Sequence, residues 1–344
     1  MRIKVLVIST SRRTRGGITA VLKLYEQSQM WQRYHCRWIE THRDGGFLRK
    51  LWYLAKGFIE YCFWLPFYDV VHIHFSLAVS AKRKYPFFRL AKLFGKKTVI
   101  HLHCGSQIDE IWSHVYQAMF EQCDCGILLS ESLREKVEEH IGKSSRFKVV
   151  YNPCPIITES TEFDQKNHIL FSGTLYEGKG YKDLIRAFAR IAHNFPDWKI
   201  VLAGNGEVEE ARSLAAELGI VNQVELLGWV NGARKHQAFC EARALCLPSY
   251  AEGFPMAVLD AWAYGLPVIT TPVGGVPDVA VDGENMLLFE PGDIEMLARN
   301  MESLIKDQNL REKLSKESQK LAAEKFNLKT IADEVGEIYE NLVY

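Results

Sequence analysis

Two acidic residues in the second half of the chain, Glu252 and Asp260, are candidates for chemistry with a polar ligand. Asp260 is the only charged side chain from Gly253 to Pro277. A carboxylate among apolar side chains costs free energy unless a partner compensates its charge. A pair of ligand hydroxyls is one such partner. A backbone cap or an arginine from elsewhere in the chain is another.

The local pattern places one acid in a loop and the other on a helix. Residues 244–270 have the order strand, loop, helix, strand. Pro255 suits the first turn of a helix, and Gly265 suits the position just after its last residue. We therefore expect Glu252 in the loop ahead of the helix and Asp260 on the helix itself.

Glycine-rich loops form a second set of candidates. Gly16 and Gly17 follow an apolar segment and precede a helical pattern, and 274–275 is a similar pair. Paired glycines let a ligand approach the backbone, and the amides at a helix start favour phosphate. A tight turn explains a lone pair equally well. Lys179 lies among the glycines of 173–180, where its ammonium could reach a phosphate.

The elements that must position these loops are short apolar strands alternating with helical segments. This alternation predicts an α/β fold with two doubly wound parallel-sheet units, and 344 residues suit two domains. The expected strands are 4–8, 70–75, 98–103, 126–129 and 147–151, then 169–172, 199–203, 224–227, 244–247 and 268–270. The boundary is expected at 152–155, followed by a polar linker at 158–167. From residue 293 onward we expect two or three helices.

Charge is balanced overall and uneven along the chain. Residues 1–152 hold 24 basic and 13 acidic side chains, a net of +11, and the remainder has a net of −11. Residues 43–97 alone have a net of +8 and mix aromatic with basic residues, mainly in 47–64 and 82–92. Such segments suit helices lying on an anionic membrane surface, although aromatics at helical spacing also suit a core. No nucleic-acid recognition module is present, so a nucleic-acid partner is not expected.

The eight cysteines form no Cys-x-x-Cys pair and have no regular spacing near histidines, so a zinc site is not expected. The apolar run at the start is too short for a signal peptide, and no stretch approaches the ~20 apolar residues of a membrane span. We expect a cytoplasmic protein with reduced thiols, peripheral on the inner face of the membrane.

Both acids belong to a more specific pattern. Seven residues separate Glu252 from Asp260, within Glu-Gly-Phe-Pro and Ala-x-Ala-x-Gly-x-Pro-Val. With the loops 16–17, 173–180, 204–206 and 274–277, this pattern resembles the retaining glycosyltransferases of family 4, which have the two-domain GT-B fold. The resemblance covers nearly the whole chain. It implies two Rossmann-like domains facing a central cleft.

The resemblance also implies residue roles. Residues 1–153, joined by a C-terminal helix at 327–344, would be the acceptor-side domain, and 154–326 would bind the nucleotide sugar. Glu252 would lie near the transferred sugar, and Asp260 would bond the ribose hydroxyls. The implied catalytic residues are Glu252, His103 and Lys179, and the implied donor-binding residues are Gly16, Gly17, Thr174, Lys179, Gly253, Phe254, Met256, Ala257 and Asp260.

Some of these assignments have alternatives. A histidine that ends a strand, as His103 does, also suits a purely structural role. Thr174 stands where the family usually has arginine, and Asp260 is one methylene shorter than the family's usual glutamate. Neither change by itself abolishes transfer.

The resemblance implies transfer, with retention, from a nucleoside diphosphate sugar to a glycan or lipid-linked glycan in polysaccharide or glycoconjugate biosynthesis, with UDP-sugars favoured. No Asp-x-Asp occurs, so we expect no metal and no cofactor. The alternatives are a nucleotide-sugar epimerase of the same fold and a noncatalytic nucleotide-sugar or glycan binding protein.

Overall fold

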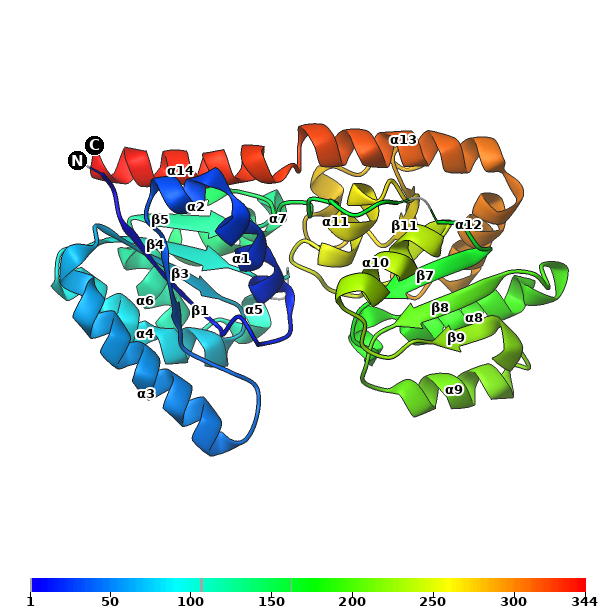
Figure 1. Ribbon diagram of the computed structural model, residues 1–344, viewed down its shortest axis with the longest axis horizontal. Coiled ribbons are helices and arrows are strands. Elements are labelled where there is room, and N and C mark those ends of the chain that lie inside the picture. The colour runs from blue at the N-terminus through cyan, green and yellow to red at the C-terminus, as the bar shows by residue number, and fades with distance from the viewer. Residues whose placement is uncertain (1, 106–107, 162) are drawn as a thin grey trace. The chain divides into compact units, whose positions relative to one another are not determined.

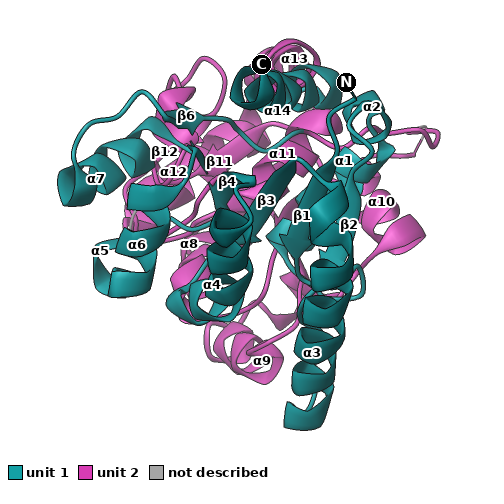
Figure 2. Ribbon diagram, turned by 90° about the vertical axis from the view of Figure 1, so that its left-hand side faces the viewer, with its two compact units in different colours: residues 1–153, 327–344 teal, residues 154–326 magenta. Residues whose placement is uncertain are grey.

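A computed structural model of the chain describes residues 2–105, 108–161 and 163–344. It divides into two compact units, coloured separately in Figure 2. Unit 1 comprises residues 1–153 and 327–344, and unit 2 comprises residues 154–326. Glu162, in the expected polar linker, lies outside the described residues.

Unit 1 is built on a sheet in which the described strands are all parallel, in the order β2-β1-β3-β4-β5-β6. The strands are β1 (Val5–Ser9), β2 (Arg37–Glu40), β3 (Val70–Phe75), β4 (Lys97–Leu102), β5 (Cys125–Leu128) and β6 (Phe147–Val149). Every residue of β1 and β3 is buried. Continuous burial of this kind is typical of parallel strands covered on both faces.

Helices cover both faces of this sheet (Figure 1). They are α1 (Gly17–Gln27), α2 (Gln29–Arg33), α3 (Phe47–Trp64), α4 (Ala78–Leu93), α5 (Ile108–Ile111), α6 (His114–Gln122), α7 (Glu131–Ile141) and α14 (Leu328–Val343). Side chains of α3, α4, α6 and α7 share one core with Ile73 of β3. Because strand side chains alternate between faces, His72 points to the opposite face, where its ring contacts Tyr339 of α14.

The last helix belongs to the first unit, although the chain has passed through unit 2 before reaching it. α14 packs against α1 and α2. Tyr339 meets Tyr34 edge-to-face, with ring centroids 5.3 Å apart, and Glu340 pairs with Arg33 at 2.6 Å. Consequently the N- and C-terminal segments lie side by side in Figure 1.

Unit 2 repeats the plan, with parallel described strands in the order β12-β11-β10-β7-β8-β9. The strands are β7 (His168–Ser172), β8 (Lys199–Ala203), β9 (Val224–Leu226), β10 (Ala244–Leu247), β11 (Val268–Thr270) and β12 (Leu287–Leu288). The helices are α8 (Tyr181–Ile191), α9 (Val208–Glu217), α10 (Gly232–Glu241), α11 (Met256–Ala263), α12 (Ile294–Lys306) and α13 (Gln308–Glu324). α8 packs against α9 and α12, and α11 packs against α13.

The expected pair of parallel-sheet units is confirmed. Each expected strand is present, with ends that differ by at most two residues, and the segment from residue 294 onward forms α12, α13 and α14. The short strands β2 and β12 were not predicted. No helix of the described part of the chain has the length and apolar character that spanning a bilayer requires.

Candidate functional site

Four loops of unit 2 that carry sequence-predicted residues leave the same edge of its sheet. They follow β7, β8, β10 and β11, which are neighbours in the strand order. Since the carboxyl ends of parallel strands share one edge, the loop at 173–180 lies beside the loop that holds Glu252. In open α/β sheets this edge is where ligands bind.

Close backbone contacts between these loops depend on glycine. Gly180 has φ +68°, and a Cβ there would overlap the carbonyl oxygen of Pro248. Gly274 has φ +61°, and a Cβ there would overlap the carbonyl oxygens of Glu252 and Gly253. The amide of Gly275 also donates to the Gly253 carbonyl at 2.7 Å. The glycine pair at 274–275, predicted as a phosphate loop, therefore also fixes the loop of Glu252.

The structure brings Lys179 and Glu252 together as an ion pair. Their side chains are only 21% and 11% exposed. Ser249 Oγ donates to the same carboxylate oxygen at 2.7 Å, and Thr271 Oγ1 in turn donates to the Ser249 carbonyl. Charges interact more strongly when little water surrounds them. An anionic ligand at this edge would compete with Glu252 for the lysine.

Asp260 lies on α11, as predicted, and is 7% exposed. Its carboxylate pairs with Lys235 Nζ of α10 at 2.6 Å. Burial raises the pKa of Asp260, and the attraction of Lys235 opposes that rise. Lys235 was not predicted from the sequence. The only sign of it in the sequence was that a buried carboxylate such as Asp260 needs a cationic partner.

The remaining donor-site candidates of unit 2 differ in what they expose. Thr174 is exposed in its loop. The Phe254 side chain is buried against the rings of Trp262 and Phe326, so only its backbone can face a ligand. Met256 and Ala257 open α11 and are half-buried. The first amides of a helix have no acceptor within the helix, so they suit an anion.

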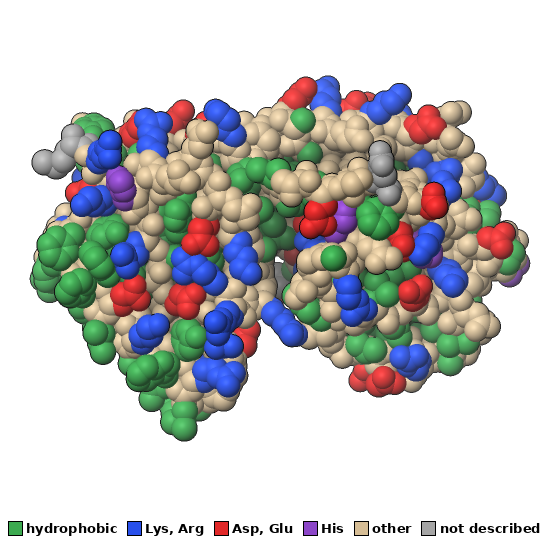
Figure 3. Space-filling model, in the orientation of Figure 1, with side chains coloured by type: hydrophobic (Ala, Val, Ile, Leu, Met, Phe, Trp, Pro, Cys, Tyr) green, Lys and Arg blue, Asp and Glu red, His purple; other side chains and the backbone are tan. Residues whose placement is uncertain are grey.

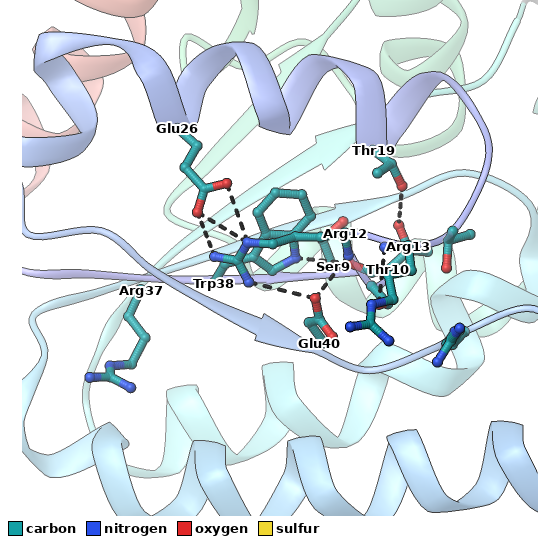
Figure 4. A network of polar contacts seen from close by, with 12 residues as sticks. Ser9, Thr10, Arg12, Arg13, Thr19, Glu26, Arg37, Trp38 and Glu40 are labelled. Atoms are coloured by element: carbon teal, nitrogen blue, oxygen red, sulfur yellow. Dashed lines mark hydrogen bonds and ion pairs between the residues drawn. The ribbon is translucent and has the colours of Figure 1, made fainter. Parts of the chain in front are cut away.

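In unit 1, Gly16 and Gly17 stand at the start of α1, where Gly16 is the N-cap residue with φ 133°. Both are exposed. Figure 4 shows how the loop before them is held: Arg12 lies between Glu26 of α1 and Glu40 of β2. The guanidinium contacts Glu26 at 2.6 Å, and the Arg12 amide donates to Glu40 at 2.8 Å. The β1–α1 loop is thus tied to two elements before its glycines.

His103 directly follows β4, so it lies at the carboxyl edge of the sheet in unit 1. Its Nε2 is 2.9 Å from Nδ1 of His74. Burial, with smaller contributions from His72 and Lys84, lowers the pKa of His103 to about 3. The ring is therefore neutral at pH 7, and one of its two nitrogens is already engaged by a neighbouring histidine.

The two segments expected to combine aromatic and basic residues on a membrane surface behave differently. In the second segment Phe87, Phe88 and Lys84 are fully buried, so these side chains of α4 belong to the interior of unit 1. In α3, by contrast, only Gly57 and Tyr61 are buried. Of the two helices, α3 is the one whose aromatic and basic side chains are mostly left at the surface of the unit.

We predict that the loop contact at Gly274 contributes strongly to the stability of unit 2. Gly283 also has a left-handed backbone, φ +70°, but a Cβ there would meet nothing within 4 Å. Gly283→Ala should cost about 1 kcal/mol from backbone strain alone, whereas Gly274→Ala should cost about 3 kcal/mol or more because overlap is added. Denaturant unfolding of both variants checks this. Equal losses would show that the overlap is relieved cheaply.

We also predict that Asp260 lowers the stability of unit 2 at neutral pH. Burial raises the pKa of Asp260 above the ordinary 3.8. As pH rises through that raised pKa, the free energy of unfolding therefore falls relative to that of a protein with an uncharged side chain at this position. Asp260→Asn should therefore unfold at a higher temperature than the unchanged protein. The difference should grow as pH rises above about 4 and become constant once the carboxylate of the folded protein is ionised. A difference that does not change with pH would contradict an energetic cost of the ionised carboxylate.

Comparisons with known proteins agree with this architecture. Residues 155–321 match the family model described as Glycosyl transferases group 1. An uncharacterized glycosyltransferase of Methanocaldococcus jannaschii is 28% identical over 298 residues, which span 79% of this chain and 75% of that protein. A Campylobacter jejuni α-1,4-N-acetyl-D-galactosaminyltransferase, named for a GalNAc-containing diNAcBac-PP-undecaprenol, is 28% identical over 211 residues, 60% of this chain and 57% of that protein.

Solved structures resemble the whole chain. HepE of Anabaena in complex with UDP has a TM-score of 0.78 at 19% identity, covering 99% of this chain and 100% of that one. The same protein in complex with UDP-glucose has a TM-score of 0.77. The chain therefore has the GT-B fold, and residues 155–321 of its second unit match the Glycosyl transferases group 1 model.

Proposed function

We propose that the protein is a retaining glycosyltransferase that transfers a sugar from a nucleoside diphosphate sugar to a glycan or lipid-linked glycan in polysaccharide or glycoconjugate biosynthesis. UDP-sugars are the favoured donors. The observation that carries the proposal is the Lys179–Glu252 ion pair at the carboxyl edge of a parallel sheet, surrounded by glycine loops.

This pair supplies what the diphosphate end of such a donor requires. Negative charge grows on the diphosphate as it leaves, and a preorganised cation stabilises that charge. Lys179 is such a cation, since loops of three different strands hold it and its partner. Glu252 would then be released to contact the sugar. The UDP and UDP-glucose complexes of HepE support a nucleotide-sugar ligand for this fold.

Other residues are assigned by the same reasoning. Asp260 would accept hydrogen bonds from the ribose hydroxyls, and the α11 start, with Gly253, would line the donor site. Gly16 and Gly17 are assigned to the diphosphate, and His103 is assigned to the sugar. The bond from the anomeric carbon to the leaving phosphate oxygen breaks, and a bond to the acceptor oxygen forms on the same face. The leaving phosphate takes the acceptor's proton, so neither an enzymic nucleophile nor a metal is required.

We further propose that α3 brings the protein to an anionic lipid surface, where lipid-linked acceptors are found. The α3 surface consists of Phe47, Leu48, Leu51, Trp52, Ile59 and Phe63, each between 50% and 79% exposed. Arg49, Lys50 and Lys56 are exposed on the same helix. Figure 3 shows hydrophobic side chains gathered at the lower left, where Figure 1 places α3. Apolar area combined with cationic flanks is typical of helices that lie in a membrane interface.

The Campylobacter relative, named for an undecaprenol-linked molecule, is consistent with a lipid-linked acceptor.

We predict that Lys179→Ala and Glu252→Ala each lower the rate of transfer about 100-fold or more, as the loss of a transition-state contact does. Lys182→Ala is the matched control, because Lys182 lies three residues away and pairs only loosely with Glu207, at 3.4 Å. The control should keep its activity. The assay follows nucleotide release from a panel of nucleotide sugars, with and without lipid-extract acceptors.

The same panel separates the alternatives. Transfer requires the acceptor, an epimerase would change the sugar without one, and a binding protein would release no nucleotide. Turnover near normal in both alanine variants would refute the assigned roles.

For the membrane surface, we predict that the protein floats with vesicles containing phosphatidylglycerol and that flotation weakens as salt rises from about 0.1 M to about 1 M. Trp52→Asp should reduce flotation strongly. Ile156→Asp is the control, since Ile156 is similarly exposed, at 59%, in unit 2. Flotation that ignores lipid charge, or falls equally in both variants, would reject the surface.

A further inference from the structure

Four histidines gather on one face of the sheet in unit 1. His72 and His74 alternate along β3, and His101 and His103 continue the same pattern from β4 onward. The strands are parallel, and His74 is the register partner of His101. Residues two apart on a strand share a face. All four rings therefore lie together, with centroid separations between 4.1 and 5.5 Å.

Three of these rings carry nitrogens that the described part of the chain leaves without a partner. His72, His74 and His101 are each at most 1% exposed. Nδ1 of His72 contacts the Tyr339 hydroxyl at 2.7 Å, and Nδ1 of His74 contacts His103. Nε2 of His72, Nε2 of His74 and both nitrogens of His101 have no hydrogen-bond partner among the described residues. Buried polar atoms in that state need a partner, such as an ordered water or a bound ion.

The three imidazoles can also converge. One nitrogen from each of His72, His74 and His101 lies within 4.8 Å of the other two. Metal–imidazole bonds of about 2.0–2.1 Å require nitrogens separated by about 3.3 Å, so the rings need to close by about 1.5 Å at most.

We propose that His72, His74 and His101 bind one late transition metal ion in the interior of unit 1. Imidazole is a ligand for zinc, copper, nickel and iron. The hydrogen bonds and ion pairs of the described residues bring no carboxylate to the four-histidine cluster, and Lys84 Nζ donates to the backbone carbonyl of His74. Since an unbalanced buried charge is costly, a monovalent ion fits this pocket better than a divalent one. We therefore expect Cu⁺ to bind more tightly than Zn²⁺.

The ion would join elements that are distant in sequence. Its ligands lie on β3 and β4, and the His72–Tyr339 contact extends the assembly to α14. The His74–His103 contact extends it to the histidine assigned to the sugar. Hydrogen bonds that hold metal ligands in place commonly set their orientation. The site is separate from the Lys179–Glu252 pair and does not depend on the proposed transfer reaction.

The test uses the full chain purified without a polyhistidine tag and stripped with a chelator. Cu⁺ under anaerobic reducing conditions and Zn²⁺ are added in separate titrations, each against a competing chelator. Elemental analysis after desalting should give about one ion per chain, and the unfolding temperature should rise by about 5 °C.

Two variants sharpen the result. His101→Leu removes a ligand together with two unpartnered buried nitrogens, so the metal-free variant should unfold at or above the temperature of the metal-free parent, and added metal should no longer raise it. His114→Leu, which changes an exposed histidine of the same unit, should keep the full metal response. The proposal is overturned if neither ion binds or shifts unfolding, or if His101→Leu retains the response. A high-resolution structure with ordered water on these nitrogens would also overturn it.

Discussion

Lys179 and Glu252 attract each other in surroundings that hold little water, and the edge of the sheet in unit 2 is organised around that attraction. An ion pair this sheltered would be costly to break without a replacement, because each partner would keep a buried charge. A bound diphosphate would replace the carboxylate as the partner of Lys179, and sugar hydroxyls would replace the lysine as the partner of Glu252. The pair therefore suits a site that exchanges an internal partner for a ligand. Asp260 of α11 and Lys235 of α10 form a second ion pair in the same unit, but there the lysine is 36% exposed.

The glycines explain how charged groups can be held so closely. Gly180 and Gly274 allow backbone contacts that any Cβ would prevent, and these contacts join the loops of neighbouring strands. A loop fixed in this way holds its charged side chain in place before a ligand arrives. Preorganised charge stabilises a transition state without a cost of rearrangement during the reaction. In the proposed function, the same residues would serve both packing and chemistry.

The sequence predicted the sheets and the positions of both acids because apolar periodicity and the signals at Pro255 and Gly265 are local. It did not predict β2 or β12, which are short strands whose pairing depends on the rest of the sheet. It did not predict Lys235, whose role follows from packing of α10 beside α11 rather than from spacing. The histidine cluster was also missed, since two His-x-His segments become one site only when β3 and β4 pair. For α4 the sequence was misleading. Its basic and aromatic composition favoured a membrane-facing helix, but Phe87, Phe88 and Lys84 are buried in the interior.

In the proposed function, Lys179 changes partner from Glu252 to a diphosphate when a donor binds. A crystal structure with a non-hydrolysable UDP-sugar tests it most directly. We expect diphosphate oxygens within hydrogen-bonding distance of Lys179 Nζ, the Glu252 carboxylate turned toward the sugar, and the ribose hydroxyls bound to Asp260. An intact Lys179–Glu252 pair, with the nucleotide bound elsewhere, would contradict it.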